Sequence, residues 1–152
     1  MNTNIWSHST KYRVQLTRRA RNEDPPLTCE EQLYEILEPL AKPGMTLMDT
    51  GCASGYYYRT LKYLGVEYYG IDSCPEYIAV GKREMPNQGL PANRLRLMQL
   101  EDLYDEAYDL VVCYNTLLYC PNYHLPLERL IQATRSHLVL RTTLGPTPVY
   151  RF

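Results

Sequence analysis

The stretch Thr46 to Gly55, which reads TLMDTGCASG, constrains the fold of this chain more than any other. A short apolar run ends at Asp49 and passes into a turn bounded by Gly51 and Gly55, after which YYYRTLKYL has a helical pattern. Glycines let a backbone approach a ligand closely, and the first turn of a helix offers free amide donors. The stretch therefore predicts a strand, a ligand-binding loop and a helix.

The spacing of this loop argues against a dinucleotide site. The fingerprint G-x-G-x-x-G needs a second glycine two residues after Gly51, and this chain has Ala53 there. The loop reads G-x-x-x-G instead, so an NAD-linked oxidoreductase is disfavoured. A tight turn that binds nothing remains the alternative at this point.

A second strand, from Val66 to Ile71, ends at Asp72, about twenty residues beyond the glycine loop. A carboxylate at this position suits a ribose, because the two ribose hydroxyls are hydrogen-bond donors. Ser73 and Glu76 have the spacing of a capping box, which predicts that a helix starts directly after the acid. Loop and acid together indicate a nucleoside site.

The pattern D-x-G-C-x-x-G from Asp49, together with GIDSCPEYI around Asp72, resembles the S-adenosylmethionine-dependent methyltransferases of the Rossmann-like fold, most closely the small-molecule type. The resemblance implies S-adenosylmethionine as the cofactor, with Asp72 on its ribose. It also implies that the N-terminal helix covers the cofactor, which makes Tyr12 and Arg13 candidates for contacts to its carboxylate.

Two further segments carry the resemblance. Gln99 stands where relatives have an acid that accepts from the adenine amino group, and its carbonyl oxygen can also accept. The run YDLVVCY, Tyr108 to Tyr114, resembles the fourth strand, whose end would lie beside the methionine part of the cofactor. The cofactor-binding residues implied are Asp49, Gly51, Cys52, Ala53, Gly55, Asp72, Ser73, Gln99, Leu100, Glu101, Cys113, Tyr114 and Asn115.

No catalytic residue is assigned by the resemblance. Many relatives carry a histidine after the fourth strand, where this chain has Tyr119. The nearest histidine, His124, is either a base or a helix-start residue facing water, and we favour the second interpretation. The function implied is methyl transfer to a small-molecule acceptor. The alternative is a non-catalytic or partner-dependent nucleoside-binding module of the same fold.

Strands alternate with helices along the chain, which predicts an α/β fold with a parallel sheet in the order 3-2-1-4-5 and helices on both faces. The helices are expected at 9–21, at 28–40 with a Thr28–Glu31 capping box, at 56–64, after Asp72 and at 125–133. The remaining strands are expected at 94–98 and 137–142. We divide the chain into an N-terminal helical flank and linker (1–27), a cofactor-binding methyltransferase domain (28–145) and a tail (146–152).

Relatives add a helix and an antiparallel pair of strands after the fifth strand, whereas this chain ends in GPTPVYRF. Pro146 and Pro148 cannot donate to a sheet ladder, so the tail is a poor replacement. The fifth strand is therefore expected to leave an open edge. We expect either a longer protein or pairing along this edge, as a homo-oligomer or with a partner chain.

The amino-acid composition limits the kinds of partner that we expect this protein to bind. A net charge of −1 over 152 residues gives no general attraction to nucleic acid or to anionic membranes. The five cysteines form no C-x-x-C pair, so neither a disulfide framework nor a metal site is indicated. The sequence has no apolar signal core and no run as long as a membrane span. We therefore expect a cytoplasmic protein without metal, membrane or nucleic-acid partners.

Overall fold

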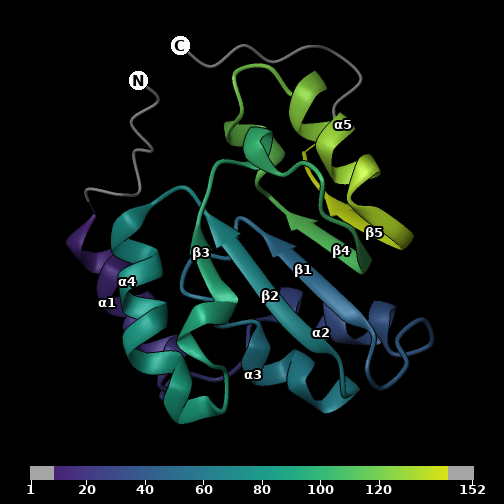
Figure 1. Ribbon diagram of the computed structural model, residues 1–152. Helices are drawn as coiled ribbons and strands as arrows, with labels where there is room; N and C mark the ends of the chain where they lie inside the picture. Colours follow the sequence, from purple (N-terminus) through teal and green to yellow (C-terminus); the bar gives the residue numbers. More distant parts are fainter. Residues whose placement is uncertain (1–8, 144–152) are drawn as a thin grey trace.

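The computed structural model, which describes residues 9–143, contains a five-stranded sheet with helices on both faces (Figure 1). The strand order is β3-β2-β1-β4-β5, and every neighbouring pair is parallel. The predicted α/β fold and strand order are therefore confirmed. The strands are β1 (Thr46–Thr50), β2 (Glu67–Asp72), β3 (Leu95–Leu97), β4 (Tyr108–Tyr114) and β5 (Thr134–Arg141).

Five α-helices and five short 3-10 helices connect the strands within residues 9–143. The α-helices are α1 (Thr10–Ala20), α2 (Thr28–Leu37), α3 (Tyr58–Leu61), α4 (Pro75–Glu84) and α5 (His124–Gln132). The 3-10 helices are η1 (Lys62–Leu64), η2 (Met85–Gln88), η3 (Ala92–Arg94), η4 (Leu100–Asp102) and η5 (Leu117–Tyr119).

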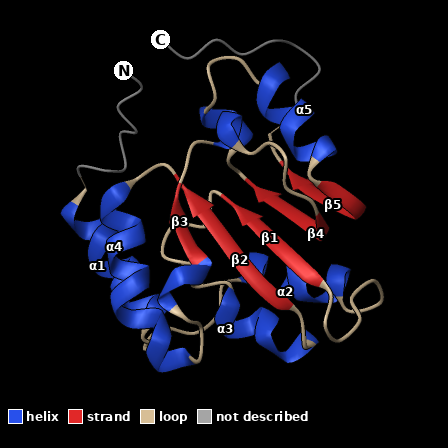
Figure 2. Ribbon diagram, in the orientation of Figure 1, coloured by secondary structure: helices blue, strands red, loops and turns tan. Residues whose placement is uncertain are grey.

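Helices cover both faces of the sheet (Figure 2). Side chains alternate along the strands, which builds two cores, one on each face. On one face, α1 to α4 pack against β1, β2 and β4, with Leu47 and Val112 among the buried strand residues. On the other face, α5, η4 and η5 pack against residues such as Met48 and Val111. Both faces of the central strands are buried, which explains why YDLVVCY is almost continuously apolar.

Several helix boundaries agree with the sequence. Ser9 caps α1, because its side chain accepts a hydrogen bond from the amide of Tyr12. Gly65 ends η1 in the left-handed conformation, with φ of 70°.

Both predicted capping boxes are wrong. At α2 the N-cap residue is Leu27, and Glu30 rather than Glu31 reaches back to accept from its amide. At α4 the N-cap residue is Cys74 rather than Ser73. Ile36, on α2, is 45% exposed, whereas Leu33 and Leu37 of the same helix are fully buried.

The last strand starts three residues earlier than predicted. Arg135, Ser136 and His137 belong to β5 but are exposed, so they carry no apolar pattern by which a strand could be identified. Among residues 9–143, no strand pairs with the outer side of β5. The predicted tail, residues 146–152, lies outside the described residues.

A buried ion pair holds the N-terminal segment against the sheet. The guanidinium of Arg59, on α3, donates to both carboxylate oxygens of Glu30, on α2, at 2.9 and 2.7 Å. It also donates to the backbone carbonyls of Arg19, Asp24 and Pro25. One side chain therefore fixes the end of α1, the following linker and α2 to the helix after the glycine loop.

Candidate functional site

The carboxyl ends of the five strands are joined by backbone hydrogen bonds. The amides of Gly51 and Cys52 donate to the carbonyl of Ile71, so the glycine loop lies against the end of β2. The amide of Met98 donates to the backbone carbonyl of Asp72, and the amide of Asn115 donates to the backbone carbonyl of Arg141. The sheet thus brings the segments predicted to bind the cofactor to one edge, where ligands of open parallel sheets bind.

The glycine loop has three left-handed residues. Gly51 and Gly55 have φ of 75°, and Ala53 has φ of 52°. A Cβ at Gly51 would lie 2.0 Å from Thr116 Oγ1, whose hydroxyl donates to the carbonyl of Thr50. The loop after β4 therefore packs directly on the glycine loop, and only glycine fits at position 51.

Asp72 lies at the tip of β2 beside this loop. Its Oδ2 accepts from the amide of Ala53 and its Oδ1 from the amide of Cys74, both over 2.8 Å. Burial raises the pKa of this carboxyl, while the bonds from the amides of Cys74, Ala53 and Ser73 oppose the rise. The amides orient this carboxylate next to the loop, and its contact to a ribose remains a prediction.

Asp49 has a different environment. Its side chain is 2% exposed and accepts a hydrogen bond of 2.6 Å from the hydroxyl of Tyr68. Burial raises the pKa of Asp49 to about 7, against the opposing effect of the Tyr68 bond. The carboxyl group lies in the interior, so a role in cofactor binding remains a prediction and would have to act through the loop.

The residues predicted around the adenine and the methionine part differ in accessibility. Gln99 and Ser73 are exposed, Glu101 is half-buried and Leu100 is buried. Cys113 is fully buried in the core below α5, which leaves only its backbone for a ligand. Tyr114 and Asn115 are half-buried at the same edge. These residues remain predicted contacts.

Tyr114 belongs to an aromatic group at the ends of β4 and β5. Its ring packs edge-on against Tyr57, with centroids 6.2 Å apart. The guanidinium of Arg141 lies over the Tyr114 ring, 5.8 Å from its centroid. The group forms an apolar wall with a cation beside it, close to the end of the glycine loop.

Helix α1 covers the glycine loop from outside. The hydroxyl of Ser54 faces the carbonyl of Leu16 at 3.5 Å, and Leu16, Ala53 and Cys74 belong to one buried cluster. Tyr12, predicted as a cofactor contact, packs edge-on against Tyr77, with centroids 5.5 Å apart. Arg13 is exposed on another side of the helix.

The sequence reasoning missed Tyr77. Among the buried side-chain polar atoms of residues 9–143, its hydroxyl oxygen alone has no hydrogen-bond partner. The residue lies in the first turn of α4, directly after Asp72. Helical periodicity identifies its face as buried, but it does not identify the neighbours of the hydroxyl.

His124 is the first residue of α5 and is exposed, as the favoured interpretation predicts. Tyr119 is 48% exposed at the end of η5. Within residues 9–143, no three His, Cys, Asp or Glu side chains are grouped so as to hold a metal ion. Over the same residues, no helix combines the length and the apolar character needed to cross a bilayer.

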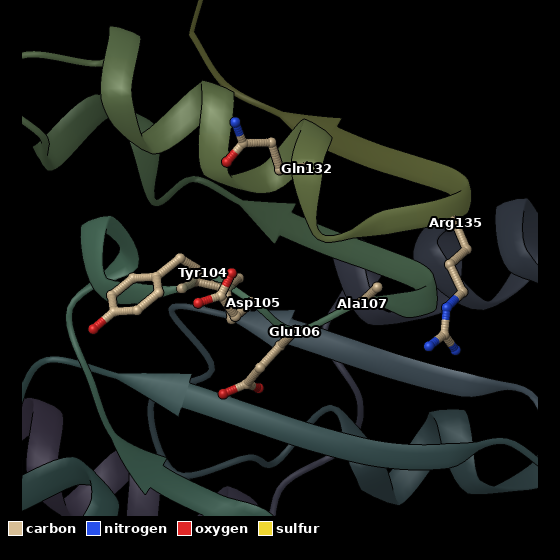
Figure 3. A pocket seen from close by; sticks show the side chains of 7 residues that line it. Tyr104, Asp105, Glu106, Ala107, Gln132 and Arg135 are labelled. Carbon is tan, nitrogen blue, oxygen red and sulfur yellow. The ribbon is translucent and has the colours of Figure 1, made fainter.

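A shallow pocket lies at the other end of the sheet (Figure 3). It is lined by residues 103–107, which precede β4, by Gln132 at the end of α5 and by Arg135 near the start of β5. Because the strands are parallel, this is the amino-end edge, opposite the glycine loop. None of the predicted site residues lines it, so we do not place the site there.

Known proteins resemble the chain at the level of sequence. The family model described as "Methyltransferase domain" matches residues 48–137. A "Ubiquinone biosynthesis O-methyltransferase" of Methylobacterium sp. (strain 4-46) is 37% identical over 76 residues, 49% of this chain and 30% of that protein. A protein of the same name from Xanthomonas campestris pv. campestris (strain B100) is 29% identical over 77% of this chain and 50% of that protein. The chain spans about half or less of these curated relatives.

Solved structures share the architecture. The magnesium protoporphyrin IX methyltransferase of Synechocystis PCC 6803, with bound SAM, is 18% identical with a TM-score of 0.64, covering 85% of this chain and 68% of that chain. A SAM-dependent methyltransferase from Geobacter sulfurreducens, in complex with S-adenosyl-L-homocysteine, is 20% identical with a TM-score of 0.57. The match covers 81% of this chain and 51% of that chain. At such identities the likeness shows a common fold.

Proposed function

Because this chain belongs to the S-adenosylmethionine-dependent methyltransferases of the Rossmann-like fold, we propose that it transfers a methyl group from S-adenosylmethionine to a small-molecule acceptor. The observation that carries the proposal is the carboxylate of Asp72, oriented by the amides of Ala53 and Cys74 beside the glycine loop. The names of the curated relatives support a small acceptor with a hydroxyl group. Their greater length makes the activity of the whole protein part of this proposal.

The residues at the carboxyl edge fit the proposed cofactor. Asp72 would accept from the ribose hydroxyls, and Gln99 with the amide of Leu100 would bind the adenine. The Gly51–Gly55 loop would face the methionine part with its backbone, while the missing side chains of Gly51 and Gly55 let Thr116 and Leu95 pack against the loop. The bound cofactor supplies a methyl group activated by a positively charged sulfur.

The contribution of the chain to the rate would be mainly positional. Holding an acceptor atom in line with the methyl group removes much of the entropic cost of the reaction. The edge of β4, with Tyr114 and the loop that follows, is the proposed place for the acceptor. A general base is needed only for an acceptor that ionises poorly, so we assign none.

The other predicted properties are also proposals. The free state of all five cysteines supports a cytoplasmic location, because reducing compartments keep thiols unpaired. We keep residues 28–145 as the proposed cofactor-binding domain.

A thermal-shift experiment tests the proposed cofactor. S-adenosylhomocysteine should raise the melting temperature and NAD should not, because only a ligand of the folded state stabilises it. Stabilisation by NAD alone would contradict the proposal. Incubation with methyl-labelled cofactor and a cell extract then tests transfer itself, and binding without any labelled product would favour the non-catalytic alternative.

Calorimetry on Asp72→Ala tests the site. The change should weaken S-adenosylhomocysteine binding by about 1 to 3 kcal/mol, the range for hydrogen bonds to a charged acceptor. Gln99→Ala should cost less, because it removes a neutral acceptor. Unchanged affinity in Asp72→Ala, with a normal circular dichroism spectrum, would remove Asp72 from the site.

A further inference from the structure

Arg141 is an exposed cation at the carboxyl edge of the sheet. It is the last residue of β5, and its backbone carbonyl accepts a hydrogen bond of 2.7 Å from the amide of Asn115. Among residues 9–143 its guanidinium takes part in no ion pair and no hydrogen bond, since the ion pairs described there use other arginines. The five N–H donors of this planar group are therefore available to a ligand.

The side chain of Arg141 lies against Tyr114 of the neighbouring strand. Tyr114 and Arg141 are register partners in the parallel pair of β4 and β5, so their side chains leave the same face of the sheet. The guanidinium carbon lies 5.8 Å from the centroid of the Tyr114 ring, and the ring of Tyr57 packs edge-on against the same ring. The contact with the ring holds the cation beside an aromatic wall.

Described contacts join this position to the glycine loop. Directly after Asn115, the hydroxyl of Thr116 donates over 3.0 Å to the backbone carbonyl of Thr50, the residue before Gly51. Tyr57 follows the other end of the loop by two residues. Tyr114 is half-buried and Arg141 is exposed, so a solute at the ends of β4 and β5 can reach both side chains.

The strand order divides the carboxyl edge into two halves. The glycine loop, Asp72 and Gln99 lie at the ends of β1, β2 and β3, so the proposed cofactor would occupy that half. β4 and β5 lie on the other side of β1. Neighbouring strands are about 4.8 Å apart, which puts β5 about 10 Å from β1. Arg141 is therefore on the side where we place the acceptor.

We propose that Arg141 determines acceptor specificity by binding the carboxylate of a planar acceptor that packs against Tyr114. The inference rests on the proposed methyl transfer and narrows the class of acceptor. A guanidinium holds a carboxylate through two parallel hydrogen bonds, which fixes the orientation of the acceptor as well as matching its charge. The rings of Tyr114 and Tyr57 offer the apolar surface for the rest of the molecule.

Benzoate and benzamide test the proposal, because they share a planar shape and differ in charge. In titrations followed by ligand-observed NMR, wild-type protein saturated with S-adenosylhomocysteine should bind benzoate more tightly than benzamide. Arg141→Gln should weaken benzoate binding about threefold to tenfold, as expected for a charged hydrogen bond that is partly exposed to solvent. It should leave benzamide binding unchanged. Arg141→Lys should lose less than Arg141→Gln, because it keeps the charge without the planar fork.

Arg135→Gln is the matched control. Arg135 is also exposed on β5, but it lies near the amino end of the strand. This variant should leave benzoate binding unchanged. The inference is wrong if the wild-type protein does not prefer benzoate, or if Arg141→Gln and Arg135→Gln have equal effects.

The affinity for S-adenosylhomocysteine separates the inference from the proposed function. Calorimetry should find this affinity unchanged in Arg141→Gln. A loss would mean that Arg141 binds the carboxylate of the cofactor, which would overturn its role toward the acceptor. If the wild-type protein does not bind S-adenosylhomocysteine at all, the proposed function is wrong and the inference falls with it.

Discussion

At the scale of single residues, Gly51 and Ala53 share a left-handed backbone but differ in their surroundings. Gly51→Ala should destabilise the protein by about 1 to 3 kcal/mol, because the new Cβ adds backbone strain and would lie 2.0 Å from Thr116 Oγ1. Ala53→Gly should be neutral or should stabilise the protein by up to about 1 kcal/mol. Glycine relieves the strain of the left-handed backbone, but it also raises the conformational entropy of the unfolded chain, which opposes folding. Urea unfolding measures both changes, and equal destabilisation would contradict the described loop.

The buried carboxyl of Asp49 predicts a pH dependence of stability. Burial raises its pKa in the folded protein to about 7, whereas an unfolded aspartate titrates near its ordinary value. Between these values the folded state holds a proton that the unfolded state has lost, so this contribution to stability is complete at low pH and disappears as pH rises through about 7. The contribution amounts to at most about 4 kcal/mol.

Asp49→Asn isolates this contribution. The amide is neutral at every pH and can still accept from the hydroxyl of Tyr68. The wild-type protein should lose more stability than the variant between about pH 5 and about pH 8, as measured by urea unfolding. Parallel pH profiles would show that Asp49 titrates normally.

At the scale of elements, the ion pair of Arg59 and Glu30 joins α3 to α2. Their side chains are 2% and 0% exposed, so removing either partner leaves a buried charge. Arg59→Met should therefore destabilise the protein by about 3 to 5 kcal/mol. Adding Glu30→Gln should recover part of this loss, because the uncompensated carboxylate is then gone. A double-mutant cycle by denaturant unfolding measures the coupling, and additive effects would contradict it.

Local sequence signals located the helices but not their first residues. The Thr28–Glu31 spacing fits a capping box, yet Glu30 is the residue that caps α2 while pairing with Arg59. At α4 the carboxylate of Asp72 already accepts from the amide of Cys74. At α2 the distant partner is Arg59, and at α4 the acceptor is the site residue Asp72. A four-residue capping pattern includes neither of these residues.

At the scale of the whole molecule, the sheet order followed from the alternation of strands and helices, because parallel crossovers admit few arrangements. The position of Asp72 beside the glycine loop followed from the same order. The missing hydrogen-bond partner of the Tyr77 hydroxyl could not be predicted from the sequence, because it depends on how α1 and α4 pack in three dimensions over that loop.

The outer side of β5 leads to a prediction about assembly. Within residues 9–143 this strand has no neighbour there, and Leu140 is 40% exposed. Unpaired strand edges recruit other strands, so we propose that two copies associate along β5. Light scattering should detect a concentration-dependent dimer, and amide exchange in residues 138–141 should slow as it forms.

Leu140→Lys should weaken this association, because a charged side chain on an edge strand opposes pairing. Ile131→Lys is the matched control, since Ile131 is 60% exposed on α5 and lies off the edge. Equal effects of the two variants, or a monomer at all concentrations, would exclude the β5 interface.

The anchoring of α1 also has a kinetic consequence. The C-terminal end of this helix is held by Arg59 through the carbonyl of Arg19, and by a bond of 2.9 Å from Arg21 to Glu84. The opposite end, which carries Tyr12, has the cap from Ser9 as its described backbone anchor. Local opening of a helix starts at its weaker end, so the first turn exchanges with solvent before the rest. Because the resemblance implies that α1 covers the cofactor, we expect cofactor release to depend on the fraying of this one turn rather than on unfolding of the whole domain.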